Sequence, residues 1–115
     1  MAVEDYVFGR ITIEGRVYTK DVLLLPGDGV RSPWWRREGH SLDPADLEEV
    51  LADPPETLVI GTGFYGNMDV PEKTLKVLRE QGIDPRVART GQAVEELNRL
   101  MATSARIAAA LHLTC

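Results

Sequence analysis

The stretch that decides the fold is Thr57-Leu58-Val59-Ile60, followed directly by Gly61-Thr62-Gly63-Phe64-Tyr65-Gly66. A short, continuous apolar run bounded by turn residues is typical of a strand that is buried on both faces, as in a parallel sheet. The glycines after the run predict a tight turn, because glycine accepts backbone angles that other residues avoid. We therefore expect residues 57–60 to form a central strand.

Helices and strands are expected to alternate on both sides of this strand. Asp43 supplies a capping carboxylate and Pro44 suits the first helical position, which together predict a short helix that ends before Pro54. Asp69 and Pro71 predict the start of a second helix, and Gly82 predicts its end. A strand over 83–88, a helix capped by Thr90 and a strand over 106–111 are expected to follow.

The first third of the chain is rich in β-branched residues. Residues 7–13 alternate between apolar and polar, Glu14-Gly15 supplies turn chemistry, and a second strand is expected over 16–25, so the pattern predicts a hairpin. Pro26-Gly27-Asp28-Gly29 is expected to end the second strand, with an irregular segment running to about residue 41. The predicted fold class is therefore α/β (α+β), with an N-terminal hairpin before alternating helices and strands.

Composition indicates an ordinary globular chain, with 115 residues, 43% hydrophobic and 27% charged. This length predicts one domain over residues 1–115, because compact domains mostly contain roughly 100–150 residues. A net charge of −5 is unlike that of a nucleic-acid-binding domain. No signal peptide pattern and no apolar run approaching roughly 20 residues is found, so we expect no membrane insertion. The single cysteine, Cys115, excludes an intramolecular disulfide, and a cytoplasmic location is expected.

The 61–66 stretch matches the pattern G-x-G-x-x-G, which three kinds of site could explain. Dinucleotide binding would need a helix that begins within the pattern, whereas Pro71 delays the helix, and it would need an acidic residue at the end of the next strand, whereas Asp84 lies at its beginning. A small anion or a substrate could contact the start of the later helix. A purely conformational glycine turn is the interpretation we favour, and no cofactor is expected.

The segment 31–40 collects tryptophan, arginine and histidine between the hairpin and the first helix. In one interpretation Trp34 or Trp35 covers the core while His40 bonds backbone groups near the helix start. In another, Trp34, Arg36 and His40 form a pocket or an interface, because tryptophan and arginine dominate the residues that contribute most to protein interfaces. General acid–base catalysis by His40 is the least favoured interpretation, because no partner is supplied nearby in sequence.

Metal and nucleophile sites are not indicated. His40 and His112 are the two histidines and lie far apart in sequence, and no cysteine or carboxylate pair stands at zinc-ligand spacing. No G-x-S-x-G pattern occurs. We therefore predict neither a catalytic set nor a metal site.

The chain contains several short motifs in a characteristic order: Phe8-Gly9-x-Ile11, Tyr18 with Asp21, Trp35-Arg36-x-x-Gly39-His40, Leu58-Val59-Ile60-Gly61-Thr62-Gly63, Pro71-Glu72, Gly82-Ile83-Asp84, Thr90-Gly91-Gln92-Ala93-Val94-Glu95 with Asn98, and His112-Leu113-Thr114-Cys115. Taken in this order, they resemble a small domain family of unknown function that includes the adipogenesis-associated domain-containing protein and mitochondrial complex I assembly factor three. The resemblance implies a hammerhead-like hairpin packed with a mixed sheet and flanking helices. It also implies action through protein contacts, as for the mitochondrial assembly factor.

The candidate site follows from this resemblance and from the residue types. We expect the 34–40 loop and the 61–66 turn to border a shallow groove, with eight candidate binding residues: Trp34, Trp35, Arg36, His40, Gly61, Thr62, Gly63 and Tyr65. The predicted function is a non-enzymatic protein-binding or assembly-factor-like module, with a protein partner or self-association. Self-association could use residues 107–111 if that strand lies at a sheet edge. The alternative is a small-molecule-binding or anion-binding protein, or an enzyme, with a pocket between the same loop and turn.

Overall fold

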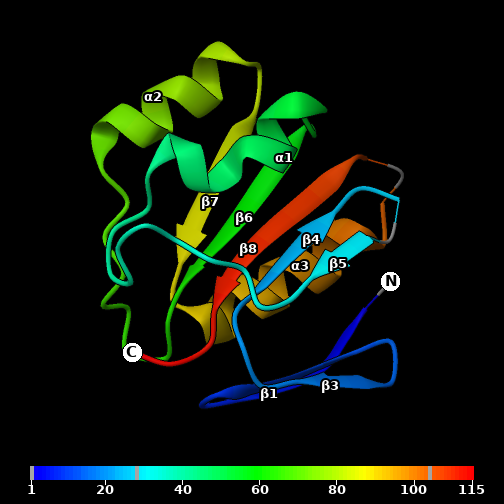
Figure 1. Ribbon diagram of the computed structural model, residues 1–115. Coiled ribbons are helices and arrows are strands. Elements are labelled where there is room, and N and C mark those ends of the chain that lie inside the picture. The colour runs from blue at the N-terminus through cyan, green and yellow to red at the C-terminus, as the bar shows by residue number, and fades with distance from the viewer. Residues whose placement is uncertain (1, 28, 104) are drawn as a thin grey trace.

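Five strands form the sheet at the centre of the molecule (Figure 1). The computed structural model describes residues 2–27, 29–103 and 105–115, so Asp28 of the expected 26–29 turn lies outside the described residues. The strand order is β5-β4-β8-β6-β7. The five strands are β4 (Val22–Leu25), β5 (Gly29–Arg31), β6 (Thr57–Thr62), β7 (Asp84–Ala88) and β8 (Ile107–His112). β6 runs parallel to both β7 and β8, whereas β4 is antiparallel to β8 and β5.

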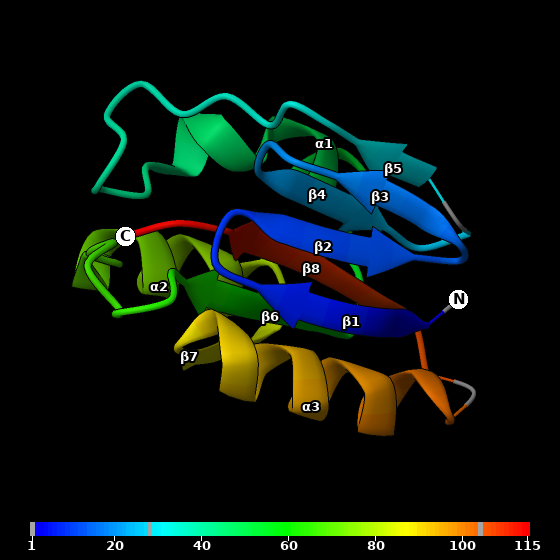
Figure 2. The same cartoon turned by 90° about the horizontal axis from the view of Figure 1, so that it is seen from below.

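Both faces of this sheet are covered, which explains why the sequence of its inner strands is almost wholly apolar. In β8, Ile107, Ala109 and Leu111 join one core cluster, and Ala108 and Ala110 join the other. The first cluster lies under α3 (Thr90–Met101) and a small antiparallel sheet (Figure 2). The second lies under a short 3-10 helix (η1, Pro44–Leu47), α1 (Glu48–Ala52) and α2 (Glu72–Glu80).

The predicted fold class is confirmed, and most helix boundaries agree with their sequence signals. Asp43 caps the first helix by accepting a hydrogen bond from the Ala45 amide, and Gly82 follows α2 with a φ of 78°. β6 is an interior strand, although β8 occupies the middle of the sheet. Because β8 pairs on both sides, the condition for self-association through residues 107–111 is not met. No helix in the described part of the chain is long and apolar enough to cross a membrane.

The N-terminal hairpin differs from its prediction in three places. The first expected strand is divided by a turn at Phe8-Gly9, giving β1 (Val3–Val7) and β2 (Arg10–Ile13), because Gly9 adopts a φ of 76°. The second is divided between the two sheets, as β3 (Arg16–Tyr18) pairs with β2 and β4 begins only at Val22. Residues 29–31, expected to be irregular, form β5 because they pair with β4.

Candidate functional site

The carboxyl ends of β6 and β8 place two polar side chains next to each other. These strands are parallel, and Thr62 is the register partner of His112. β4 runs the opposite way along β8, so Asp21, just before β4, reaches the same edge of the sheet. The pairing of the strands therefore brings together Asp21 and His112, which are 91 positions apart.

Asp21, Arg36 and His112 form a closely packed cluster at this edge. Asp21 Oδ2 lies 2.8 Å from Arg36 Nη1 and 2.8 Å from His112 Nδ1, and Asp21 Oδ1 accepts a hydrogen bond of 2.8 Å from the Leu113 amide. The three side chains are largely buried, with exposed fractions of 17% for Asp21, 5% for Arg36 and 8% for His112. One carboxylate thus joins the hairpin exit, the 34–40 loop and the C-terminal segment.

Hydrogen bonding fixes how His112 is oriented. An ionised carboxylate only accepts hydrogen bonds, so Nδ1 donates to Asp21 and cannot also accept from Arg36 Nη2, which lies 3.1 Å away. Arg36 instead donates through Nε and Nη2 to the Gly39 carbonyl. Nε2 of His112 is buried and has no hydrogen-bond partner among the residues that the structure describes. The His40 ring lies next to the His112 ring, with the two ring centroids 6.0 Å apart.

The cluster keeps Asp21 ionised. Burial by itself raises the pKa of this carboxyl, but hydrogen bonds from His112, the Leu113 amide and Arg36 outweigh burial and hold the pKa below its ordinary value. Asp21 is therefore the negative partner of Arg36 at neutral pH, and the pair carries no net charge.

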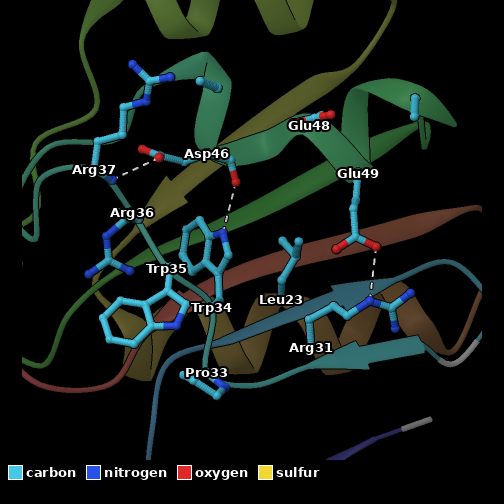
Figure 3. Close-up of a pocket in the computed structure, with 12 residues that line it drawn as sticks. Leu23, Arg31, Pro33, Trp34, Trp35, Arg36, Arg37, Asp46, Glu48 and Glu49 are labelled. Atoms are coloured by element: carbon cyan, nitrogen blue, oxygen red, sulfur yellow. Dashed lines mark hydrogen bonds and ion pairs between the residues drawn. The ribbon is translucent and has the colours of Figure 1, made fainter.

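The two adjacent tryptophans have opposite environments. Trp34 is 7% exposed, and its Nε1 donates a 2.9 Å hydrogen bond to the Asp46 carbonyl. The centroid of its ring lies 4.9 Å from Cζ of the Arg36 guanidinium. Trp35 is 81% exposed. Figure 3 shows Trp34 directed toward Asp46 and Trp35 on the outer side of the loop. Trp34 belongs to the core, as the covering interpretation of the loop expects, and Trp35 is left on the surface.

Trp34, Trp35 and Arg36 line two grooves. The first, of about 820 Å³, lies against α1 (Figure 3) and we call it the α1 groove. The second, of about 610 Å³, we call the Lys20 groove. Its other lining residues are Thr19, Lys20, Asp21, Pro33, Gly39 and Thr114.

The glycines of the 61–66 turn make room for other parts of the chain. A Cβ at Gly61 would lie 2.7 Å from Thr90 Oγ1, and one at Gly63 would lie 2.5 Å from the Cys115 carbonyl oxygen. Gly63 also has a φ of 108°. The next helix begins at Glu72, well past the turn, so the arrangement agrees with a conformational turn filled by the C-terminal segment.

Thr90 differs from its predicted role as a helix cap. Arg89 is the N-cap residue of α3, and no side chain caps that end. The Thr90 hydroxyl donates instead to the His112 carbonyl (2.6 Å) and accepts from the Gly63 amide (2.9 Å). Tertiary contacts thus use a hydroxyl whose position in sequence indicates a local cap.

Exposed aromatic rings gather beside the turn. Phe8, Phe64 and Tyr65, which we call the aromatic cluster, are 48%, 43% and 59% exposed, and their ring centroids lie 5.1 to 6.0 Å apart. The C-terminal segment helps to bring them together, because the Leu113 carbonyl accepts from the Gly9 amide and the Thr114 carbonyl accepts from the Phe64 amide.

The candidate residues are therefore distributed over several environments. Arg36, His40 and Thr62 lie around His112, and His40, Trp35 and Tyr65 are exposed. The remaining three, Trp34, Gly61 and Gly63, are in the interior. Sequence reasoning did not select Asp21 or His112 for the site. Both stand in the family-like motifs, which is the signal that could have found them.

Solved structures share this fold over nearly the whole chain. A conserved hypothetical protein from Pyrococcus horikoshii is 27% identical with a TM-score of 0.82, covering 100% of both chains. An outer membrane protein from Bartonella henselae is 26% identical with a TM-score of 0.82, covering 98% of this chain and 94% of that one. A Mth938-like domain from Bordetella pertussis, 23% identical with a TM-score of 0.70 and covering 97% of this chain and 85% of that one, shows the fold alone. The chain belongs to the protein family of unknown function DUF498/DUF598, which matches its residues 3–112.

Proposed function

We propose that this chain is a protein-binding module whose main contact residue is Trp35. The observation that carries the proposal is the 81% exposure of this indole in a loop whose neighbouring residues are fixed. Tryptophan is enriched among the residues that contribute most to binding at protein interfaces, so an exposed indole on an ordered loop fits a contact residue.

The residues on each side of Trp35 are anchored to different parts of the fold. Trp34 bonds through its amide to the Asp21 carbonyl and through its indole to Asp46. Arg36 is held by Asp21 and by the Gly39 carbonyl. Because the loop is already ordered, a partner that binds Trp35 loses little conformational freedom of the protein in doing so, which favours affinity.

The polar groups next to Trp35 are largely committed within the chain. Both oxygens of Asp21 accept hydrogen bonds, and Arg36 donates to Asp21 and Gly39. Recognition by an exposed indole therefore fits this site better than chemistry on a substrate does. The resemblance to the mitochondrial assembly factor, which acts through protein contacts, points the same way, and kinship with that protein is a prediction.

Affinity capture from the native source tests the proposal. We expect Trp35→Ala to lose its partner, with capture falling at least about tenfold, since a central tryptophan often contributes 2 kcal/mol or more. Val87→Ala is the control, because it removes another exposed apolar side chain, on β7, outside both grooves and the aromatic cluster. Arg36→Ala is unsuitable, because it leaves Asp21 without its cation. Folded Trp35→Ala protein that retains every captured partner would overturn the proposal.

The alternative function, binding of a small molecule, is favoured by the Lys20 groove. Its volume of about 610 Å³ lies within the range of roughly 300–1,000 Å³ found for ligand pockets. A thermal shift with phosphate-bearing or carboxylate-bearing metabolites separates the two functions. Stabilisation at micromolar concentration, retained in Trp35→Ala, would favour the small molecule.

A further inference from the structure

We infer that the partner inserts an extended segment into the Lys20 groove, placing an acidic side chain against Lys20 and a neighbouring apolar side chain against Trp35. This inference rests on the proposed function and names the chemistry of its partner.

Charge in the Lys20 groove is positive and uncompensated. Its charged lining residues are Lys20, Asp21 and Arg36, and the last two neutralise each other at 2.8 Å. No carboxylate within the described residues lies in ion-pair distance of Lys20, whose side chain is exposed. The whole chain, in contrast, carries a net charge of −5. A local cation on an acidic protein favours an acidic group from a partner.

The α1 groove offers no comparable preference. Its lining contains three arginines, at 31, 36 and 37, and three acids, at 46, 48 and 49. Arg31 pairs with Glu49 at 3.0 Å, so two of these charges neutralise each other (Figure 3). The Asp46 carboxylate accepts a hydrogen bond from the Arg37 amide. Balanced and internally bonded charges leave little to attract a segment of either sign, so we assign the partner to the Lys20 groove.

The Lys20 groove has apolar surface beyond its polar floor. Trp35 and Pro33 line it, and Thr114 connects it to the aromatic cluster, because the Thr114 carbonyl accepts a 2.7 Å hydrogen bond from the Phe64 amide. An extended chain that leaves the groove past Thr114 therefore meets Phe64. An acidic residue flanked by apolar residues is the sequence that matches this arrangement.

Selection of random peptides displayed on phage tests the inference with the full chain as bait. We expect the wild type to enrich peptides with an aspartate or glutamate next to an aromatic or large aliphatic residue. Synthetic copies should bind Lys20→Glu about tenfold more weakly, because an attractive charge pair becomes a repulsive one. Lys76→Glu is the matched control, since it makes the same charge change on an exposed residue of α2 and should bind as the wild type does.

The outcomes separate this inference from the proposed function. Peptides that need Trp35 but bind Lys20→Glu as well as the wild type would overturn the acidic partner and leave the module intact. Peptides that bind Trp35→Ala unchanged would overturn both. Enrichment of basic peptides, or of none, would also overturn the inference. Binding that weakens as salt rises, together with selection of basic peptides by Lys20→Glu, would support it.

Discussion

The 34–40 loop and the 61–66 turn are held by different kinds of bond. The loop is fixed by side chains, through the Trp34 indole and the Arg36 guanidinium. The turn is fixed mainly by backbone atoms, since the Phe64 amide donates to the Thr114 carbonyl and the Asn67 amide donates to the main-chain oxygen of Cys115, and the Thr90 hydroxyl adds one side-chain bond to the Gly63 amide. Side-chain substitutions should therefore release the loop, whereas the turn should respond mainly to added bulk at its glycines.

This difference also separates the two regions in their response to pH. The loop depends on the ionised carboxylate of Asp21, whose pKa is lowered by the hydrogen bonds that oppose its burial. The backbone bond between Phe64 and Thr114 in the turn involves no titrating group. An exposed aromatic surface is presented in both cases, Trp35 by the loop and Phe64 with Tyr65 by the turn.

The turn should show the largest loss of stability, on substitution of Gly63. In Gly63→Ala the new Cβ would lie 2.5 Å from the Cys115 carbonyl oxygen, and the residue would have to keep a φ of 108°. We expect the free energy of unfolding to fall by about 3 kcal/mol or more, because strain and a backbone clash combine. Chemical denaturation measures this loss.

Gly15→Ala is the control for the contribution of backbone angle alone. Gly15 has a φ of 77°, and a Cβ there would meet nothing within 4 Å. Its loss should be about 1 kcal/mol. Equal losses at Gly15 and Gly63 would mean that the C-terminal segment moves away freely, and the turn would then not depend on close backbone packing.

The loop should show the next largest effect, through Asp21. Asp21→Asn keeps the shape of the side chain but removes the charge that Arg36 and His112 face. We expect a loss of about 2–3 kcal/mol at pH 7, somewhat below the 3–5 kcal/mol typical of a fully buried pair, because Asp21 is 17% exposed.

The pH dependence of that loss gives a sharper test. The folded pKa of Asp21 lies below the unfolded value, so its ionised form stabilises the fold above the unfolded pKa, and this contribution disappears as pH falls through the folded pKa. Unfolding of the wild type and Asp21→Asn, compared from pH 7 downward, should show a gap that narrows below about pH 4. A gap that stays constant would mean that Asp21 acts through its shape and not through its charge.

Local signals predicted the elements better than they predicted the sheets. Asp43, Pro44 and Gly82 mark helix ends through interactions within a few residues, and the structure agrees with them. The division of the first hairpin strand was missed because Gly9 was expected to be a strand residue, although Val7-Phe8 followed by Gly9-Arg10 interrupts the apolar alternation there. β5 was missed because its residues become a strand only by pairing with β4.

The site was predicted in part for the same reason. Residue type and the family-like motif selected Arg36 and His40, since arginine and histidine in a tryptophan-rich loop are unusual. Asp21 and His112 meet only because β4 and β8 pair side by side, and sequence separation hides that contact. Residue type also could not distinguish Trp34 from Trp35, because which of two adjacent tryptophans enters the core depends on the Asp46 carbonyl that accepts the Trp34 indole.

The smallest effect on stability is expected at Trp35, although this residue carries the proposed function. Its side chain is 81% exposed and lies outside both core clusters, so Trp35→Ala should change the free energy of unfolding by no more than about 0.5 kcal/mol. Trp34→Ala is the contrasting variant, because it empties a core position and should be strongly destabilising. Thermal or chemical unfolding of the two variants measures the contrast directly. A loss above about 1 kcal/mol for Trp35→Ala would show that the indole supports the fold, and exposure would then no longer argue that a partner covers it. A near-zero loss, combined with lost partner binding, is the result that only a recognition role produces.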